Sequence, residues 1–246
     1  MALNIEDSPT APAITPLLRL AFRPLFLGGT IFSVIAIAWW SHFWLNPFNW
    51  LPYGGPIWWH GHEMLFGFGA LIVVGFLLTA VQHWTGVTGL RGWPLLVLTL
   101  AWVLGRLLLA LGADLPLWLV MAGDRLFLIL ATIAMAYPVF KAKQRRNMIF
   151  VPILAILALL NGVSHWGVLT NQSEVAQLSL HVSIIIFLFL ITFLFFLVIP
   201  FFSSFFSFFH LFLFLFSLFL LSFLFLFLFF SFFFFSLFFF SFFFLL

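Results

Sequence analysis

Residues 61–83 read GHEMLFGFGALIVVGFLLTAVQH. Apart from Glu63, the stretch contains no acidic residue, no lysine and no arginine. A membrane-spanning α-helix needs roughly 20 consecutive apolar residues, and this stretch is long enough. Comparable apolar runs recur along the chain, with short polar breaks between them. The sequence therefore predicts several membrane-spanning helices.

The overall composition agrees with this prediction. Of the 246 residues, 65% are hydrophobic and 6% are charged, whereas an average soluble domain has about 25% charged residues. The formal net charge of +3 is no sign of nucleic-acid binding, because most of the basic residues lie in the breaks between the apolar runs and do not form one solvated face. We predict an all-α, polytopic helical membrane bundle over residues 1–200, surrounded by the lipid bilayer. Its six transmembrane helices are expected at 25–45, 61–83, 93–112, 116–139, 149–169 and 178–200.

Seven of the nine lysines and arginines lie before the first helix or in alternate connections of this bundle. The first, third and fifth connections contain neither residue. The other breaks hold Arg19 and Arg23 before the first helix, Arg91 in the second connection, and Lys141, Lys143, Arg145 and Arg146 in the fourth. Because basic loops stay on the cytoplasmic side, this pattern predicts a cytoplasmic N-terminus.

The last segment differs from the rest of the chain. Residues 201–246 contain only Phe, Leu, Ser and a single histidine, His210. Membrane helices normally carry small residues for packing and turn residues between spans, and this segment has neither. Pyrimidine-only codons encode Phe, Leu and Ser. We interpret the segment as a low-complexity sequence artefact that can still form a helix, and we assign no function to it.

The predicted topology places most histidines at one side of the membrane. Five of the seven lie near the outer ends of their helices: His42, His60, His62, His165 and His181. Neutral imidazole is the commonest metal ligand in proteins, and ionisable groups at membrane depth are candidates for function. The candidate metal ligands are therefore His60, His62, His165 and His181. A histidine beside interfacial tryptophans can also be there without any ligand, and this alternative stays open.

The spacing around the histidine pair restricts its geometry. His60 and His62 are two residues apart, so on a regular helix they point in different directions. Either the segment is irregular or the two histidines serve different sites. Glu63 is three residues after His60, so it can orient the imidazole of His60 by accepting a hydrogen bond. It can instead complement the positive N-terminus of the helix.

Charged residues also occur one to two turns inside the third and fourth helices. They are Arg106, Asp124 and Arg125. Charges at such depth need partners, and the simplest partner for Asp124 is an arginine. Alternatively, an arginine such as Arg106 pairs with a carboxylate of a bound cofactor, while Asp124 supports the site.

Several motifs in order resemble the NnrS family over about residues 17–202. They are RLAFRPLFLG (19–28), WHGHEMLFGF (59–68), GFLLTAVQHWTG (75–86), LRGWP (90–94) and RRNMIFVP (145–152), together with Asn161 and His165. The resemblance implies a multi-pass protein of the bacterial cytoplasmic (inner) membrane that contains haem and copper. It also implies a role in denitrification and in resistance to nitric oxide and nitrosative stress. Family members are about twice as long, with roughly twelve spans, so this chain is expected to be the N-terminal half.

Two positions depart from the family pattern. The family has an asparagine where this chain has His83, so we do not count His83 as a ligand. The family has Gly-Gly-Arg before a Val-Ile-Pro-Phe-Phe string, whereas here Phe195, Phe196 and Leu197 precede it. The lost Gly-Gly-Arg is expected to remove part of the family's site.

The resulting hypothesis is a haem- and copper-binding membrane protein of the nitric oxide response. His60, His62 and His165 would hold the cofactors, with His181 as a further metal ligand, Arg106 as a haem contact, and Glu63 and Asp124 as supporting carboxylates. Haem would be non-covalent, because the chain has no cysteine. Whether the protein turns over nitric oxide or only binds it stays open.

Two other classes of membrane protein compete with this hypothesis. A transporter of metal ions or small molecules would need polar residues through the whole span, but the first, second and fifth helices are nearly apolar beneath their outer histidines. An electron-transfer enzyme of the nitric oxide reductase type would need paired histidines deep in the span, whereas the histidines of this chain lie near the outer ends of their helices.

Overall fold

The computed structural model describes residues 14–45, 50, 52–110 and 115–202. Most of the segment interpreted as an artefact, from residue 203 onward, lies outside these ranges. The chain divides into two compact units, residues 1–191 and 192–246. The packing described below is that of the first unit.

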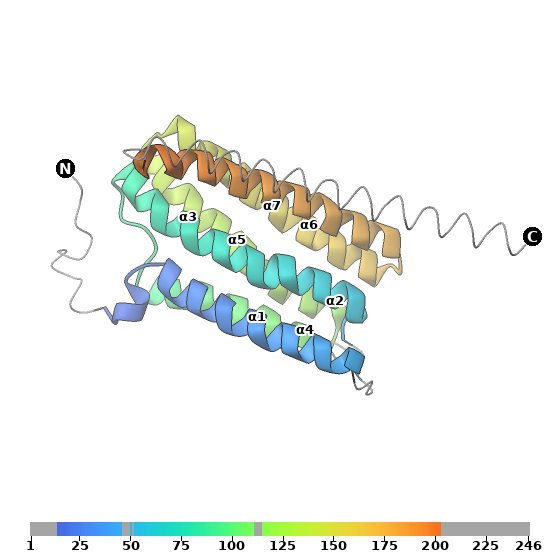
Figure 1. The fold of residues 1–246 in the computed structure, drawn as a ribbon. Coiled ribbons are helices and arrows are strands. Elements are labelled where there is room, and N and C mark those ends of the chain that lie inside the picture. The colour runs from blue at the N-terminus through green and yellow to red at the C-terminus, as the bar shows by residue number, and fades with distance from the viewer. Residues whose placement is uncertain (1–13, 46–49, 51, 111–114, 203–246) are drawn as a thin grey trace, which may run out of the picture. The chain divides into compact units, whose positions relative to one another are not determined.

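The described residues form helices and no strands (Figure 1). The longer elements are α1 (Phe22–Leu45), α4 (Trp93–Ala110), α5 (Leu117–Lys141), α6 (Phe150–Leu169) and α7 (Ser173–Phe202). Between α1 and α4, one continuous helix is made of α2 (Pro56–His62), the π-helical segment η4 (Glu63–Gly69) and α3 (Ala70–Thr85). Short 3-10 helices, η3 (Pro16–Leu18) and η6 (Arg145–Ile149), precede α1 and α6.

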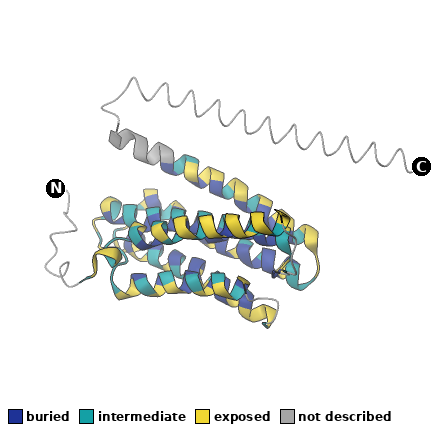
Figure 2. Ribbon diagram, turned by 60° about the horizontal axis from the view of Figure 1, so that its bottom comes forward, coloured by how far each residue is buried: buried dark blue, intermediate teal, exposed yellow. Residues whose placement is uncertain are grey.

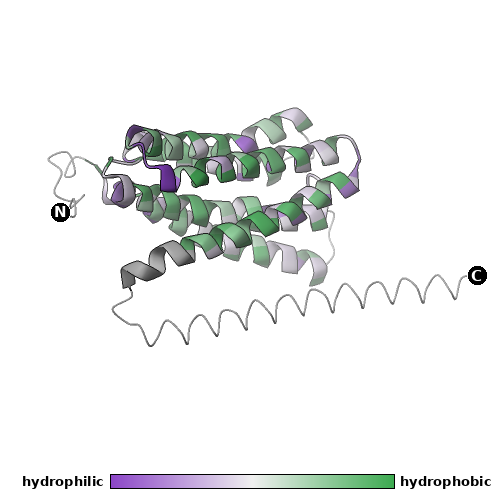
Figure 3. Ribbon diagram, turned by 90° about the horizontal axis from the view of Figure 1, so that it is seen from above, coloured by the Kyte–Doolittle hydropathy of each residue, from purple (hydrophilic) through white to green (hydrophobic). Residues whose placement is uncertain are grey.

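Six of these helices are long and apolar enough to cross a membrane. They begin and end within a few residues of the predicted spans, so the predicted all-α, polytopic bundle is confirmed. Figure 3 shows that the helices are predominantly hydrophobic along their length. Large apolar side chains are exposed on the outer faces, for example Ile35, Leu104, Ile133 and Leu159. Helices that are apolar on every face are typical of a bundle surrounded by lipid.

The packing of the first unit centres on α5, which contacts α3, α4 and α6, while α1 packs on α3 (Figure 1). Figure 2 shows buried residues on the helix faces that turn toward other helices. The buried centre is mostly aliphatic, with Leu71, Leu77, Leu128 and Leu157 each at most 1% exposed.

Glycines set the closeness of two of these contacts. A Cβ atom at Gly75 of α3 would lie 3.1 Å from Cβ of Leu25 in α1. A Cβ at Gly167 of α6 would lie 2.5 Å from the backbone nitrogen of Ala176 in α7. Small residues let helix backbones approach closely in membranes, where packing replaces the hydrophobic effect as a driving force.

Polar groups inside the bundle bond across helices. Thr79 of α3 accepts a hydrogen bond from the backbone N–H of Phe22 at 3.0 Å, which satisfies a donor in the first turn of α1. The indole of Trp102 in α4 donates to the carbonyl of Gly67 at 2.8 Å. That carbonyl belongs to η4, so the π-helical segment is anchored to α4 directly beyond the histidine pair.

Candidate metal centre

Three buried residues from three helices meet near one end of the bundle. They are His62 of α2, Asp124 of α5 and His165 of α6, with exposed fractions of 0%, 3% and 0%. His62 and Asp124 lie close after the starts of their spans, and His165 lies close before the end of its span. At 1.5 Å of rise per residue, each is about 6–10 Å from that end. Charged and imidazole side chains are thus enclosed within the membrane-spanning part.

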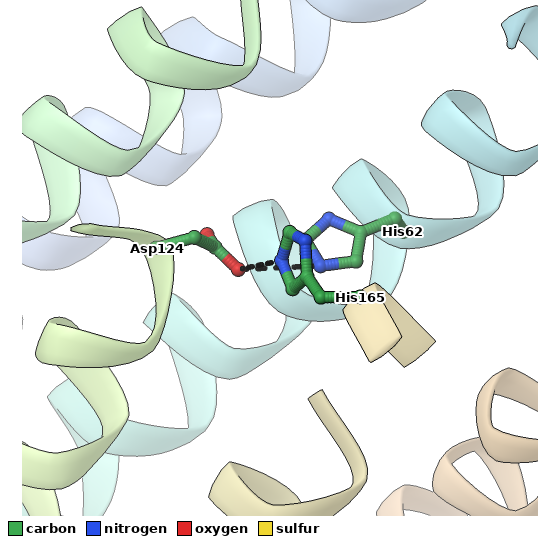
Figure 4. Close-up of side chains that lie close together, drawn as sticks. All are labelled: His62, Asp124 and His165. Carbon is green, nitrogen blue, oxygen red and sulfur yellow. Dashed lines mark hydrogen bonds and ion pairs between the residues drawn. The ribbon is translucent and has the colours of Figure 1, made fainter. Parts of the chain in front are cut away.

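The two imidazoles face the same carboxylate oxygen. Oδ2 of Asp124 lies 3.2 Å from Nε2 of His62 and 3.1 Å from Nε2 of His165 (Figure 4). The ligand atoms of the three residues all lie within 4.8 Å of one another. Small adjustments of these side chains would place all three atoms around one ion, since metal–nitrogen and metal–oxygen bonds are about 2 Å long.

The far side of each imidazole also faces an oxygen atom. Nδ1 of His62 lies 3.5 Å from Oε1 of Glu63, and Nδ1 of His165 lies 3.2 Å from the hydroxyl of Tyr53. In metal sites, a histidine ligand almost always donates its second ring N–H to a carboxylate or another oxygen, which fixes the ring. Both histidines therefore have the surroundings of metal ligands that bind through Nε2.

Arg106 of α4 links the two carboxylates. Its Nη1 lies 3.2 Å from Oε2 of Glu63, and its Nη2 donates to Oδ1 of Asp124. Asn161 of α6 donates to Oδ2 of Asp124 at 2.6 Å and lies 3.1 Å from Nε2 of His62. The sequence left two roles open for an arginine at this depth, an ion pair with Asp124 or a contact with a carboxylate of a bound cofactor. The structure shows Arg106 in the ion pair. Two carboxylates buried in an apolar bundle require such a cation.

Aromatic residues enclose the histidines. The ring of Trp58 stacks on His62 at 4.5 Å, and its Nε1 donates to Ser164 at 2.9 Å. Tyr53 lies in the connection before α2 and is 3% exposed. Burial, and to a lesser extent the negative charge of Asp124, raise the pKa of the Tyr53 hydroxyl. The phenol therefore stays neutral at physiological pH and can donate or accept the hydrogen bond with His165.

Many polar atoms of this cluster have no hydrogen-bond partner. These buried atoms are Nδ1 of His62, both carboxylate oxygens of Glu63, Nε and Nη1 of Arg106, and Oδ1 of Asn161. Glu63 and Arg106 are close enough for an ion pair but are not aligned for a hydrogen bond. Buried polar groups are normally satisfied, and a concentration of unsatisfied ones is expected where an ion or ligand belongs.

The other candidate ligands lie elsewhere. His60 is on a different side of α2, where its ring stacks on Trp40 of α1 at 4.0 Å and 17°. His181 is exposed on α7, and His42 and His83 are also exposed. The structure thus brings His62 and His165 together with Asp124, and leaves His60 and His181 apart from them. The imidazole that Glu63 contacts is that of His62.

Sequence reasoning missed three residues of the cluster: Tyr53, Trp58 and Ser164. Trp58 and Ser164 had no signal beyond lying next to candidate ligands. The signal for Tyr53 was its position in the turn Pro52-Tyr53-Gly54-Gly55, just before the histidine pair. Gly54 and Gly55 have φ values of 73° and 83°, which favour glycine and let the chain bend back over the end of the bundle.

A family model described as NnrS protein matches residues 16–246 of this chain. No curated protein and no solved structure matches it.

Replacing Asp124 with asparagine tests how far the cluster supports the fold. The Asp124→Asn variant loses the negative charge that balances Arg106, and breaking a buried ion pair costs about 3–5 kcal/mol. We expect a clear loss of stability in denaturation of the detergent-solubilised protein, measured by circular dichroism in the presence of a chelator. Glu174→Gln is the matched control, because Glu174 is an exposed carboxylate in the first turn of α7. Equal stability of the two variants would contradict the central position of Asp124.

Proposed function

This chain belongs to the NnrS family, and on that premise we propose that it is a membrane metalloprotein of the nitric oxide response. Its metal centre would consist of His62, Asp124 and His165. The observation that carries the proposal is the convergence of two imidazole Nε2 atoms on one carboxylate oxygen, with an oxygen behind each ring.

The donor set indicates which ions suit the centre. Two imidazoles and one carboxylate suit copper, iron, zinc or nickel, and imidazole is a frequent ligand of copper. The chain has no cysteine, so no thiolate competes for the ion. Copper is the ion that the family resemblance implies, and the residues present fit it.

Each neighbouring residue has a task in this proposal. Glu63 and Tyr53 lie at the outer nitrogens of the two imidazoles and would orient both rings. Arg106 balances the negative charge of Glu63 and Asp124, and Trp58 covers the ring of His62. A bound copper ion would supply an open coordination position for a small ligand. Nitric oxide is small and uncharged, so it can reach the centre through the surrounding hydrocarbon.

Haem is the second cofactor that the resemblance implies, and His60 is the residue best placed to ligate it. His60 takes no part in the metal centre, and its Nδ1 is buried without a hydrogen-bond partner. The surface at Gly67 is not available for a flat macrocycle, because a Cβ there would meet Arg106, Glu63 and Phe32 at 2.5–2.7 Å. With His60 as the ligand, haem would lie on the His60 and Trp40 side of α2, and it would be non-covalent because the chain has no cysteine.

The orientation follows from the distribution of basic residues. Lys141, Arg145 and Arg91 lie at the end of the bundle opposite to the metal centre, since α5 begins near the centre and ends at Lys141. With basic residues in the cytoplasm, the metal centre faces the periplasm of a bacterial inner membrane.

A transporter is less well supported. The buried residues between the metal centre and the cytoplasmic end are apolar over several turns, including Val74 and Leu78 of α3, Ala131 of α5 and Leu154 of α6. An ion crossing the bundle would need polar groups at these levels. The proposal is therefore binding of nitric oxide at a metal centre, and turnover is not part of it.

Copper loading tests the metal centre. We expect the purified protein to retain near-stoichiometric copper after a chelator wash, and the His62→Ala and His165→Ala variants to lose it, measured by inductively coupled plasma mass spectrometry. His42→Ala and His83→Ala are matched controls on exposed histidines. Glu63→Gln and Tyr53→Phe should weaken copper binding by about 10–100-fold, because they remove groups that orient the ligands. Full copper retention by both His62→Ala and His165→Ala would refute the centre.

An optical spectrum tests the haem assignment. We expect a Soret band in the purified protein that is lost in His60→Ala, because this substitution removes the axial ligand, and that persists in His83→Ala. A band that survives in His60→Ala and disappears in His62→Ala would move the haem to the His62 side of the helix.

Growth under nitric oxide tests the function itself. Bacteria that produce the chain should resume growth sooner after a pulse of a nitric oxide donor than bacteria that produce the His62→Ala, His165→Ala double variant. The His42→Ala, His83→Ala double variant, produced to the same level in the membrane, should behave like the unchanged protein. Equal lag times for all strains would rule out a role of this centre in the nitric oxide response.

A further inference from the structure

A second arginine lies next to the metal centre but is not part of it. Arg125 follows Asp124 on α5 and extends across the seam between α5 and α6. A Cβ atom at Gly162 of α6 would lie 2.7 Å from Cζ and 2.8 Å from Nε of Arg125. The guanidinium group therefore rests directly on the α6 backbone, in a notch that exists because residue 162 has no side chain.

This guanidinium has no anionic partner among the described residues. The two buried carboxylates, Glu63 and Asp124, are both paired with Arg106. Nε of Arg125 is buried and has no hydrogen-bond partner. An unpaired charge at membrane depth is costly, and arginines in spans normally pair or reach toward the interface. The partner of Arg125 must therefore come from outside the described chain.

The depth of Arg125 indicates where that partner comes from. Arg125 is eight residues after Leu117, the first residue of α5, which corresponds to about 12 Å along the helix. The span of α5 has 25 residues, or about 37 Å, and so exceeds the roughly 30 Å of hydrocarbon. Part of those 12 Å thus lies outside the hydrocarbon. The side chain of Arg125 also points back toward the Leu117 end of α5, because side chains on a helix tilt toward its N-terminus. The guanidinium is within reach of lipid headgroups that dip slightly inward.

Two exposed tryptophans mark the same seam. Trp118 lies two turns before Arg125 on the same side of α5 and is 65% exposed. Trp166 lies one turn after Gly162 on α6 and is 58% exposed. Exposed tryptophans are enriched at the level of the headgroups, where the indole covers the glycerol region of a lipid. The guanidinium of Arg125, the notch at Gly162 and the two tryptophans thus occur together on a surface that faces the bilayer.

We propose that Arg125, seated on Gly162 beneath Trp118 and Trp166, binds the phosphate group of a membrane phospholipid. A guanidinium offers two parallel N–H donors that match the oxygens of a phosphate, which a lysine ammonium cannot do. The proposal is independent of the metal centre, so it stands or falls without copper or haem.

Native mass spectrometry of the full chain in detergent tests this site. Phosphatidylglycerol is added to the delipidated protein, and we expect it to bind. Its affinity should fall about tenfold in Arg125→Gln, which is the size of effect expected for one charge-assisted bidentate contact. Arg125→Lys should recover only part of the affinity. Arg146→Gln is the matched control, because Arg146 is an exposed arginine at the opposite end of the bundle, and it should change the affinity less than Arg125→Gln.

Gly162→Ala tests the notch while keeping the charge. A methyl group at residue 162 would displace the guanidinium, so this variant should also lose affinity for phosphatidylglycerol. Gly28→Ala is its control, because a Cβ at Gly28 makes only ordinary contacts, the nearest at 3.5 Å from Trp102. Helix content by circular dichroism verifies that each variant is folded. Unchanged lipid affinity in folded Arg125→Gln or in folded Gly162→Ala would overturn the proposal. If Arg125→Gln lost haem absorbance and kept its lipid affinity, the partner of Arg125 would be a haem carboxylate, and the proposal would again be overturned.

Discussion

The pairing of Arg106 with Asp124 and Glu63 is the interaction on which the polar end of the bundle depends. Three membrane helices contribute one charged group each, from α4, α5 and the helix that contains η4. In hydrocarbon, an unpaired carboxylate would be neutralised or would expose itself to water. Because one guanidinium contacts both carboxylates, Asp124 can remain a buried anion toward which two imidazoles turn.

The same charge arrangement supports the proposal that the cluster of His62, Asp124 and His165 holds a cation. Two carboxylates share one guanidinium in an enclosed space, and the two imidazoles lie against the carboxylate of Asp124. A metal ion would offset the negative charge of Asp124 and would also use the Nε2 atoms that now crowd around it. The unsatisfied acceptor atoms of this cluster are both carboxylate oxygens of Glu63 and Oδ1 of Asn161. Buried acceptors without a partner are what a bound cation would satisfy.

Hydropathy alone was sufficient to predict the spans, because a helix in lipid needs an apolar run of fixed length and little else. Combined with the topology drawn from the basic residues, it placed His62 and His165 near the outer ends of their helices and Asp124 one to two turns inside its helix. The two-residue spacing of His60 and His62 left open whether they serve one site or two, and the structure places them on different sides of α2. The choice of partner could not be predicted either. Arg106 and Arg125 lie at comparable depth, and only the packing shows that Arg106 reaches the carboxylates.

The different environments of these two arginines depend on what the neighbouring helices present. Arg106 meets Glu63 beside Gly67, where a side chain would collide with both groups. Arg125 meets Gly162 and, among the described residues, forms no ion pair with a carboxylate. A glycine in each case provides room for a guanidinium against a helix backbone. Small residues in this bundle therefore do more than bring helices together, because they also make room for a guanidinium inside the membrane-spanning part at two positions, beside Gly67 and at Gly162.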